Sequence, residues 1–367
     1  MSAERDAEAR DFLARAGWRG ARVEPLEGDA STRRYARIDL NGRKAMLMDQ
    51  PQSAETPSAP AGASPEERSK LGYNAIARLA GADTSRFIAV AEHLRGLGLS
   101  APEIYAADPE RGFVLIEDLG DNLYADVLER GGGDEAELYA RAAEALAALH
   151  AAPAPSVLTK AMPLHAYDEA ALLAETDLLP QWHLPYALGR AARAEEIAEH
   201  RELWRRALGE VRDGAPVFVH RDYHAQNLLW LPDRAGSARV GMIDFQDAVA
   251  GSRAYDLVSL LEDARRDVPP EIANATAEHY LSLAEGADAE KFRAQMAVMA
   301  AQRNAKIVGI FTRLYKRDGK PRYLSYLPRV WGYLNRDLEH PALAPLKSWY
   351  DRTIPRQERG RAGETIV

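Results

Sequence analysis

The residues of this chain whose types and spacing suggest chemistry lie mostly in one short stretch, Val219 to Trp230, with the sequence VHRDYHAQNLLW. Asn227 follows Asp222 by five positions, and Asp244 comes directly after the apolar run VGMI. A carboxylate can accept the proton of an attacking hydroxyl, while an amide oxygen and a second carboxylate are suitable ligands for Mg²⁺. The spacing predicts a phosphoryl-transfer site in which Asp222 is the catalytic base and Asn227 and Asp244 hold the metal.

The two histidines of this stretch allow two interpretations. His220, Asp222 and His224 form a His-x-Asp-x-His pattern, which with Asp244 as an outer ligand suits the zinc or iron site of a metal hydrolase. That interpretation leaves Asn227 without a role. We therefore favour the alternative, in which His220 braces the catalytic loop and His224 faces the substrate or packs beneath it.

The elements that must position these residues divide the chain in two. Up to residue 117, the alternating segment RYARIDL, an Asn-Gly turn and the run AMLMD favour antiparallel strands, with one helix at 85–97. Helical patterns then dominate, around a single β-rich segment at 215–249. We expect an α+β protein with a β-rich lobe at 1–117 and a mostly helical lobe at 118–367. Residues 51–70, rich in Pro, Ser and Ala, are expected to be irregular.

Composition narrows the class of protein. The 367 residues include no cysteine, which excludes disulfides, thiolate metal sites and a cysteine nucleophile. The net charge of −8 argues against nucleic acid as a partner. The N-terminus is charged and no stretch approaches eighteen apolar residues, so we expect a cytoplasmic protein without membrane contact, acting as a monomer on a small molecule.

Four stretches resemble the aminoglycoside phosphotransferase and choline kinase family. They are GDASTRRYARI, FVLIEDLGDNL, VHRDYHAQNLLWL and GMIDFQDAVAGSRAYDLVSLLED. The resemblance implies a protein-kinase-like bilobal fold, ATP and Mg²⁺ as cofactors, and a small-molecule hydroxyl as the phosphoryl acceptor.

The resemblance also implies a nucleotide site. Adenine would lie against the backbone from Glu117 to Leu119, and a turn would cover the phosphates. That turn comprises Gly28, Asp29, Ala30, Ser31 and Thr32. The family's usual lysine falls at Met48 in this chain, so Lys44, or else Arg33 or Arg34, is expected to supply the positive charge.

Within that family, three stretches resemble more specifically the bacterial kinases of cell-wall recycling, which phosphorylate the anomeric hydroxyl of N-acetylmuramate and N-acetylglucosamine. These stretches are GDASTRRY, QRNAKIVGIFTRL and GKPRYLSYLPRVWGYL. The resemblance implies a sugar 1-phosphate as product and a role in peptidoglycan recycling. Arg303 and Lys306 would suit the lactyl carboxylate of N-acetylmuramate. The candidate substrate contacts are His224, Glu175, Trp182, Arg303, Asn304 and Lys306.

Two alternatives stay open at this stage. An aminoglycoside, choline or another hydroxyl compound could be the acceptor, because global charge says nothing about a single cleft. The missing nucleotide lysine also fits a nucleotide-binding protein that has lost catalysis.

Overall fold

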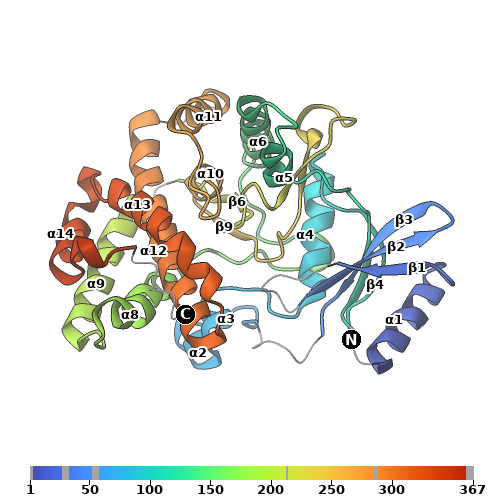
Figure 1. Cartoon of the computed structure of the whole chain (residues 1–367), viewed down its shortest axis with the longest axis horizontal. Helices are drawn as coiled ribbons and strands as arrows, with labels where there is room; N and C mark the ends of the chain where they lie inside the picture. The colour runs from blue at the N-terminus through green and yellow to red at the C-terminus, as the bar shows by residue number, and fades with distance from the viewer. Residues whose placement is uncertain (1–2, 27–32, 52–57, 212–213, 285–287, 361–367) are drawn as a thin grey trace. The chain divides into compact units, whose positions relative to one another are not determined.

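The computed structural model describes residues 3–26, 33–51, 58–211, 214–284 and 288–360 (Figure 1). Contacts group the chain into two compact units. Unit 1 comprises Met1–Asp134, Pro155–His165 and Gln226–Ala248, and unit 2 comprises Glu135–Ala154, Ala166–Ala225 and Val249–Val367. This grouping differs from the expected division at residue 117, because the segment with Asn227 and Asp244 joins the N-terminal unit.

Unit 1 is built on a five-stranded antiparallel sheet of order β1-β2-β3-β5-β4. The strands are β1 (Arg22–Pro25), β2 (Arg34–Leu40), β3 (Arg43–Asp49), β4 (Ile104–Asp108) and β5 (Phe113–Ile116). Asn41 and Gly42, both with positive φ, make the tight turn between β2 and β3, as the Asn-Gly signal predicts. β1 was not expected, because its four side chains are all exposed and leave no alternating apolar pattern.

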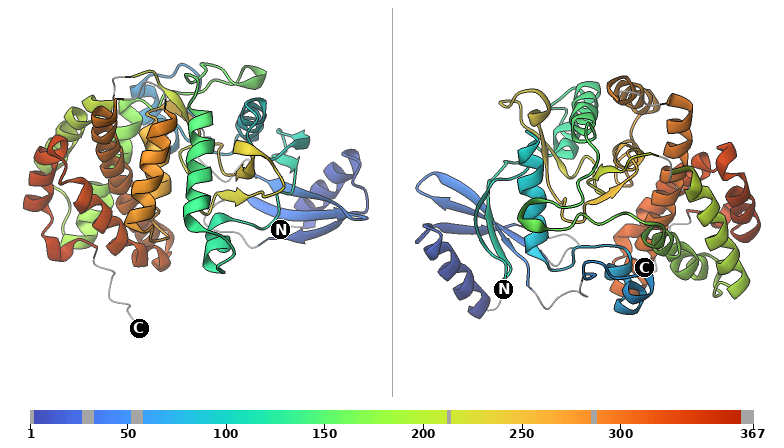
Figure 2. Two further views of the ribbon diagram at one scale, coloured as in Figure 1. Left: turned by 90° about the horizontal axis from the view of Figure 1, so that it is seen from above. Right: turned by 180° about the vertical axis from the view of Figure 1, so that it is seen from behind.

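Two helices cover opposite faces of this sheet, α1 (Ala3–Arg15) and α4 (Thr84–Gly96) (Figures 1 and 2). Phe12 of α1 stacks on Phe113 with ring centroids 5.6 Å apart, and both belong to a buried cluster that includes Leu47 and Leu115. Full burial of each such side chain contributes roughly 1.5–3 kcal/mol. Because side chains alternate along a strand, Met48 of β3 projects to the other face, on the side of α4.

One helix of unit 1 contradicts the irregular structure expected for residues 51–70. α2 (Pro65–Leu71) begins with a capping box, in which the Ser64 hydroxyl accepts the Glu67 N–H at 3.2 Å and the Glu67 carboxylate accepts the Ser64 N–H at 2.8 Å. The signal Ser-Pro-Glu-Glu was present in the sequence. Unit 1 also contains α3 (Tyr73–Ile76) and α5 (Tyr124–Glu129).

The β-rich segment at 215–249 forms two small sheets instead of one. β6 (Val217–Val219) pairs with β9 (Val249–Gly251) in unit 2, whereas β7 (Leu228–Trp230) pairs with β8 (Val240–Met242) in unit 1. The chain crosses between the units directly after the catalytic loop.

Unit 2 is otherwise helical, as predicted. Its helices are α6 (Glu135–Leu149), α7 (Glu169–Thr176), α8 (Leu184–Leu188), α9 (Ala194–Ala207), α10 (Ala254–Leu261), α11 (Pro270–Leu283), α12 (Ala289–Asp318), α13 (Leu327–Asp337) and α14 (Ala344–Thr353). α12 passes very close to the chain after α7, because a Cβ at Gly309 would lie 2.5 Å from the Leu178 carbonyl carbon. A glycine is therefore required where α12 crosses this segment.

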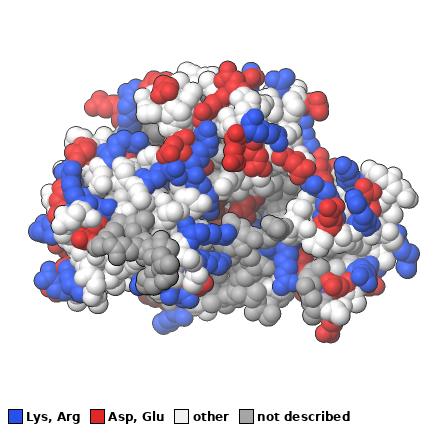
Figure 3. Space-filling model, viewed as in Figure 1, with Lys and Arg blue, Asp and Glu red and all other residues white. Residues whose placement is uncertain are grey.

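No helix in the described ranges is long and apolar enough to cross a membrane. Basic and acidic side chains intermix over the face shown in Figure 3, in keeping with 47 Lys and Arg against 55 Asp and Glu in the whole chain.

Candidate active site

The loop that carries Asp222 is held by a buried carboxylate in unit 2. The backbone N–H groups of His220 and Arg221 donate to the two carboxylate oxygens of Asp256, at 2.6 and 2.8 Å. Asp256 lies in the first turn of α10 and is fully buried. Burial raises the pKa of Asp256 to about 7, although the two N–H donors act in the opposite direction. The position of the loop is thus set by α10.

Local strain and a histidine also shape this loop. Arg221 has a φ of 82°, a conformation that costs a residue with a side chain roughly 1–3 kcal/mol and that often marks functional sites. His220 is fully buried, and its Nδ1 accepts the Asp222 N–H at 3.3 Å. The geometry places His220 beneath the loop as a brace and not at its surface.

A buried network surrounds Glu175 on α7. Its carboxylate lies 2.5 Å from Arg221 Nη2 and 3.2 Å from Lys306 Nζ. It also accepts hydrogen bonds from the Tyr167 hydroxyl and, at 2.9 Å, from Gln302 Nε2. Burial alone would raise the pKa of Glu175, but Lys306 and Arg221 outweigh it and lower the pKa. Glu175 therefore remains an anion that balances two buried cations.

The charges near Asp222 favour its ionised form. Burial opposes ionisation, yet the neighbouring basic groups, Lys306 first and Arg303 among them, lower the pKa of Asp222 overall. Lys306 is held in place by Glu175 and by the Tyr255 hydroxyl, which lies 3.0 Å from its Nζ. Asp222 is half-buried, so an ionised carboxylate beside fixed cations remains accessible to a hydroxyl substrate.

Two of the expected substrate contacts need correction. Asn304 is fully buried, and its Nδ2 donates to Glu262 at 2.6 Å and to Asp337 at 2.9 Å. Glu175 is equally buried and fully engaged. Both side chains are therefore structural parts of unit 2, because neither offers a surface to a sugar.

The remaining substrate candidates occupy different environments. Arg303 is 5% exposed and its Nη1 donates to the Glu262 carbonyl at 3.3 Å, while His224 is 6% exposed. Trp182 is half-buried in a short π-helix, Leu179–His183. Of the six candidates, Lys306, Arg303 and His224 contribute to the electrostatic field at Asp222.

The two residues expected to hold a metal, Asn227 and Asp244, lie in unit 1. Asn227 directly precedes β7, and its backbone carbonyl accepts a hydrogen bond from the Ile243 N–H at 3.1 Å. Ile243 is the residue immediately before Asp244. Asn227 and Asp244 thus occur at the same end of the β7–β8 pair. Asp244 has a φ of 62°, a second strained position. An amide oxygen and a carboxylate together fit Mg²⁺, which needs few protein ligands when phosphates and water complete its shell.

The zinc interpretation gains no support from the described ranges, in which no three His, Asp or Glu side chains are grouped to bind a metal.

The residues expected to bind the nucleotide are only partly described. Gly28 to Thr32 lie outside the described residues. At Glu117 the backbone N–H donates to the Glu103 carbonyl at 2.8 Å. In the described part of the chain, the Glu117 carbonyl and the Leu119 N–H make no hydrogen bond, so both remain suited to an adenine edge.

Lys44, the first of the basic residues expected to serve the phosphates, stands opposite Asp39 in the β2–β3 register, beside the turn, and is exposed. At about 3.3 Å per residue, it lies about 16 Å along β3 from Asp49, the end nearest Arg33. Arg33 instead contacts Asp244, with Nη1 2.9 Å from Asp244 Oδ1.

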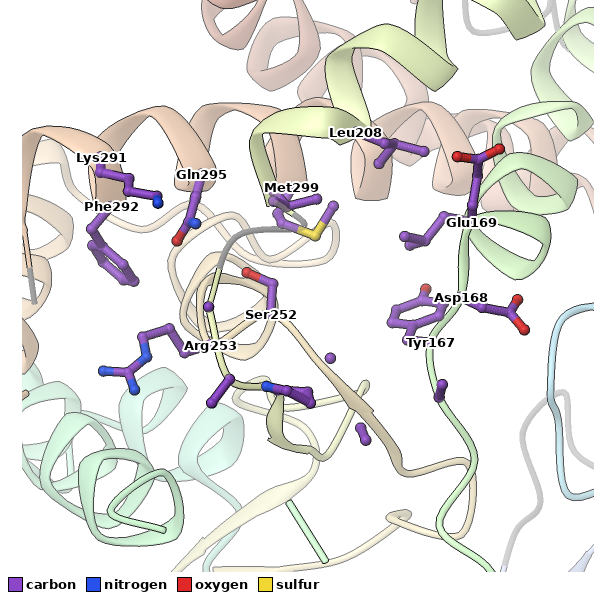
Figure 4. A pocket seen from close by; sticks show the side chains of 18 of the residues that line it. Tyr167, Asp168, Glu169, Leu208, Ser252, Arg253, Lys291, Phe292, Gln295 and Met299 are labelled. Carbon is purple, nitrogen blue, oxygen red and sulfur yellow. The ribbon is translucent and has the colours of Figure 1, made fainter. Parts of the chain in front are cut away.

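Unit 2 also contains a cavity of about 770 Å³ that the sequence did not indicate (Figure 4). Arg253, Lys291 and Phe292 line one side, and Tyr167 and Glu169 line another. Asp222 is not among the residues that line this cavity. The cavity is lined by Pro216, which precedes β6, whereas Asp222 lies in the loop that follows β6.

A model of the phosphotransferase enzyme family matches residues 22–294, which include Asp222, Asn227 and Asp244. The chain belongs to the phosphotransferase enzyme family. A Caulobacter vibrioides protein named N-acetylmuramate/N-acetylglucosamine kinase is 47% identical to it over 98% of this chain and 99% of that protein. A Pseudomonas aeruginosa protein of the same name is 34% identical over 89% of this chain and 87% of that protein.

Solved structures place the chain in the same fold as small-molecule kinases. A microcompartment-associated aminopropanol kinase superposes with a TM-score of 0.61 at 15% identity, covering 94% of this chain and 98% of that one. A choline kinase from Streptococcus pneumoniae gives 0.58 at 14% identity, covering 93% and 99%. The expected protein-kinase-like α+β fold is confirmed. The chain is a kinase of this family, which uses ATP.

Sequence reasoning missed Asp256 and the role of Arg221. A signal for Asp256 existed, since it is the one acidic residue in the otherwise apolar helix AYDLVSLL. A buried carboxylate in such a helix needs hydrogen-bond donors, which the catalytic loop supplies.

Proposed function

We propose that this protein is an ATP- and Mg²⁺-dependent kinase of N-acetylmuramate and N-acetylglucosamine that forms the sugar 1-phosphate in peptidoglycan recycling. The observation that carries the proposal is the 47% identity to the Caulobacter kinase over nearly the whole of both chains. The Asp222 environment supports it, because the base is ionised and accessible.

In this mechanism the residues of the chain have separate tasks. Asp222 accepts a hydrogen bond from the sugar hydroxyl, orients it for attack and takes its proton. A hemiacetal hydroxyl is more acidic than other sugar hydroxyls, so a carboxylate of lowered pKa suits the anomeric position. Lys306 and Arg303 provide positive charge for an anionic acceptor such as N-acetylmuramate.

Asn227 and Asp244 would hold Mg²⁺, which supplies charge neutralisation on the phosphates. The backbone at Glu117 and Leu119 would bind adenine.

A panel of acceptors tests the proposal. The purified protein is incubated with ATP and Mg²⁺ and one of N-acetylmuramate, N-acetylglucosamine, choline or an aminoglycoside, and products are read by ³¹P NMR. We expect an anomeric phosphate with the first two compounds only. The matched control is the methyl glycoside of N-acetylglucosamine, which lacks an anomeric hydroxyl and should give no product.

Four outcomes would contradict the proposal. A 6-phosphate, or equal turnover of the methyl glycoside, would rule out the anomeric position. Turnover of choline or an aminoglycoside instead would change the substrate class, and no turnover of any acceptor would favour a non-catalytic nucleotide-binding protein. Asp222→Ala, which should lose about 10²–10⁴-fold in kcat, distinguishes turnover at this site from a contaminating kinase.

A further inference from the structure

Arg33 lies immediately before β2 and makes an ion pair with the carboxylate that we assign to the metal. Its Nη1 is 2.9 Å from Asp244 Oδ1, and the same oxygen accepts a hydrogen bond from Gln246 Nε2 at 3.1 Å. The Arg33 side chain is 14% exposed, whereas that of Asp244 is 44% exposed. A largely buried cation thus sits beside a carboxylate that remains open to ligands.

The register of the sheet shows why β3 does not supply this charge. Tyr35 pairs with Met48, and the Tyr35 hydroxyl lies 3.5 Å from Met48 Sδ, so these two side chains share one face. Alternation along β2 places Arg33 on that same face. Met48 is 1% exposed and carries no charge. The neighbouring Arg34 projects to the other face and is exposed.

Arg33 and Asp244 can both keep their contact and bind further ligands. A guanidinium has five N–H donors in a planar fork, and a carboxylate has about four lone-pair sites. Two donors on Oδ1 leave the second oxygen of Asp244 available to a metal ion. Arg33 also interacts with Tyr35 and Asp247, and a guanidinium beside this carboxylate suits phosphate oxygens, which guanidinium groups bind in pairs.

We propose that Arg33 is a nucleotide-binding residue that joins the metal carboxylate to the phosphates of ATP, so that the cation comes from the start of β2 and not from β3. This inference rests on the proposed function, because it takes ATP as the phosphoryl donor. It adds a role that the spacing of Asp222, Asn227 and Asp244 does not contain.

Equilibrium binding separates a phosphate contact from a structural one. Dissociation constants of Mg·ATP and of adenosine are measured by titration calorimetry for the wild type, Arg33→Gln, Arg33→Lys and Arg34→Gln. Adenosine lacks phosphates and reports only on the adenine and ribose site. Arg34→Gln is the matched control, one residue away on the opposite face.

We expect Arg33→Gln to weaken Mg·ATP binding about 10- to 100-fold and adenosine binding less than 2-fold. Arg33→Lys keeps the charge but loses the fork, so it should weaken Mg·ATP binding by about 3- to 10-fold. Arg34→Gln should stay within 2-fold of the wild type for both ligands.

The inference is overturned if Arg33→Gln binds Mg·ATP within 2-fold of the wild type, or if it loses adenosine binding to the same extent as Mg·ATP. If Arg33→Gln does not fold, Arg33→Lys provides the test, and unchanged Mg·ATP binding by Arg33→Lys overturns the inference. Failure of the proposed function looks different, because the wild type would then bind Mg·ATP and transfer no phosphate to either sugar.

Discussion

The Glu175→Gln substitution tests the buried network that positions Lys306 beside Asp222. In the wild type, one fully buried carboxylate balances Arg221 at 2.5 Å and Lys306 at 3.2 Å. Glutamine keeps the size of the side chain but removes the charge, so both cations lose their anion. Removal of one partner from a buried ion pair costs about 3–5 kcal/mol. At about 2–4 °C per kcal/mol for a unit of this size, the melting temperature should fall by about 6–20 °C.

The measurement is urea denaturation at a pH of about 7, followed by circular dichroism, with thermal melting in parallel. The pKa of Glu175 is lowered on folding, so its contribution is complete above its ordinary value of 4.5 and is lost as the pH falls through the lower folded value. The difference between wild type and variant should therefore shrink in acid. Glu202→Gln is the control, because its pairs with Arg205 and Arg206 are exposed, and exposed ion pairs contribute little to stability. A Glu175→Gln variant as stable as Glu202→Gln would refute the reasoning.

Three further predictions concern the same unit. Lys306→Met removes a cation that lowers the pKa of Asp222, so the pKa of Asp222 should rise. The acidic limb of the pH profile of kcat/KM should then move to higher pH, and an unchanged limb would contradict this role of Lys306. Asp256→Asn leaves one of two buried loop N–H groups without an acceptor, so we expect the free energy of unfolding in urea to fall by about 1–3 kcal/mol and kcat to fall with it. A loss of stability with unchanged kcat would mean that the position of the loop does not depend on α10. Gly309→Ala should lower the melting temperature although alanine is the better helix former, because the added methyl would lie 2.5 Å from the Leu178 backbone; Gly332→Ala, with open space around it, should not.

Much of the fold could be predicted because its signals are local. The Asn-Gly turn between β2 and β3 and the apolar periodicity of the unit 2 helices depend only on neighbouring residues. The capping box at Ser64 and Glu67 was equally local, and its omission was an error of interpretation. β1 could not be predicted in this way, because its side chains are all exposed and show no alternation of buried and exposed positions.

The sequence by itself predicted the chemical groups of the candidate site. Asp222, Asn227 and Asp244 are predicted from residue type and spacing, since they lie close together along the chain and next to short apolar strands. The sequence did not indicate which residues far apart along the chain contact one another. Arg33 meets Asp244 across 211 positions, and Glu175 meets Lys306 across 131, so no local pattern links them.

Only the tertiary structure decided which charged residues serve the site and which support it. Lys44 and Arg33 are both basic and both lie near β2 and β3, but the antiparallel register places Lys44 beside the hairpin turn and Arg33 at the other end, where it contacts Asp244. Glu175 and Asn304 are polar residues in apolar helices, which in sequence suggests substrate contact. Both are completely buried: the Glu175 carboxylate accepts from Gln302 Nε2, and Asn304 Nδ2 donates to Glu262, so these contacts lie within the fold.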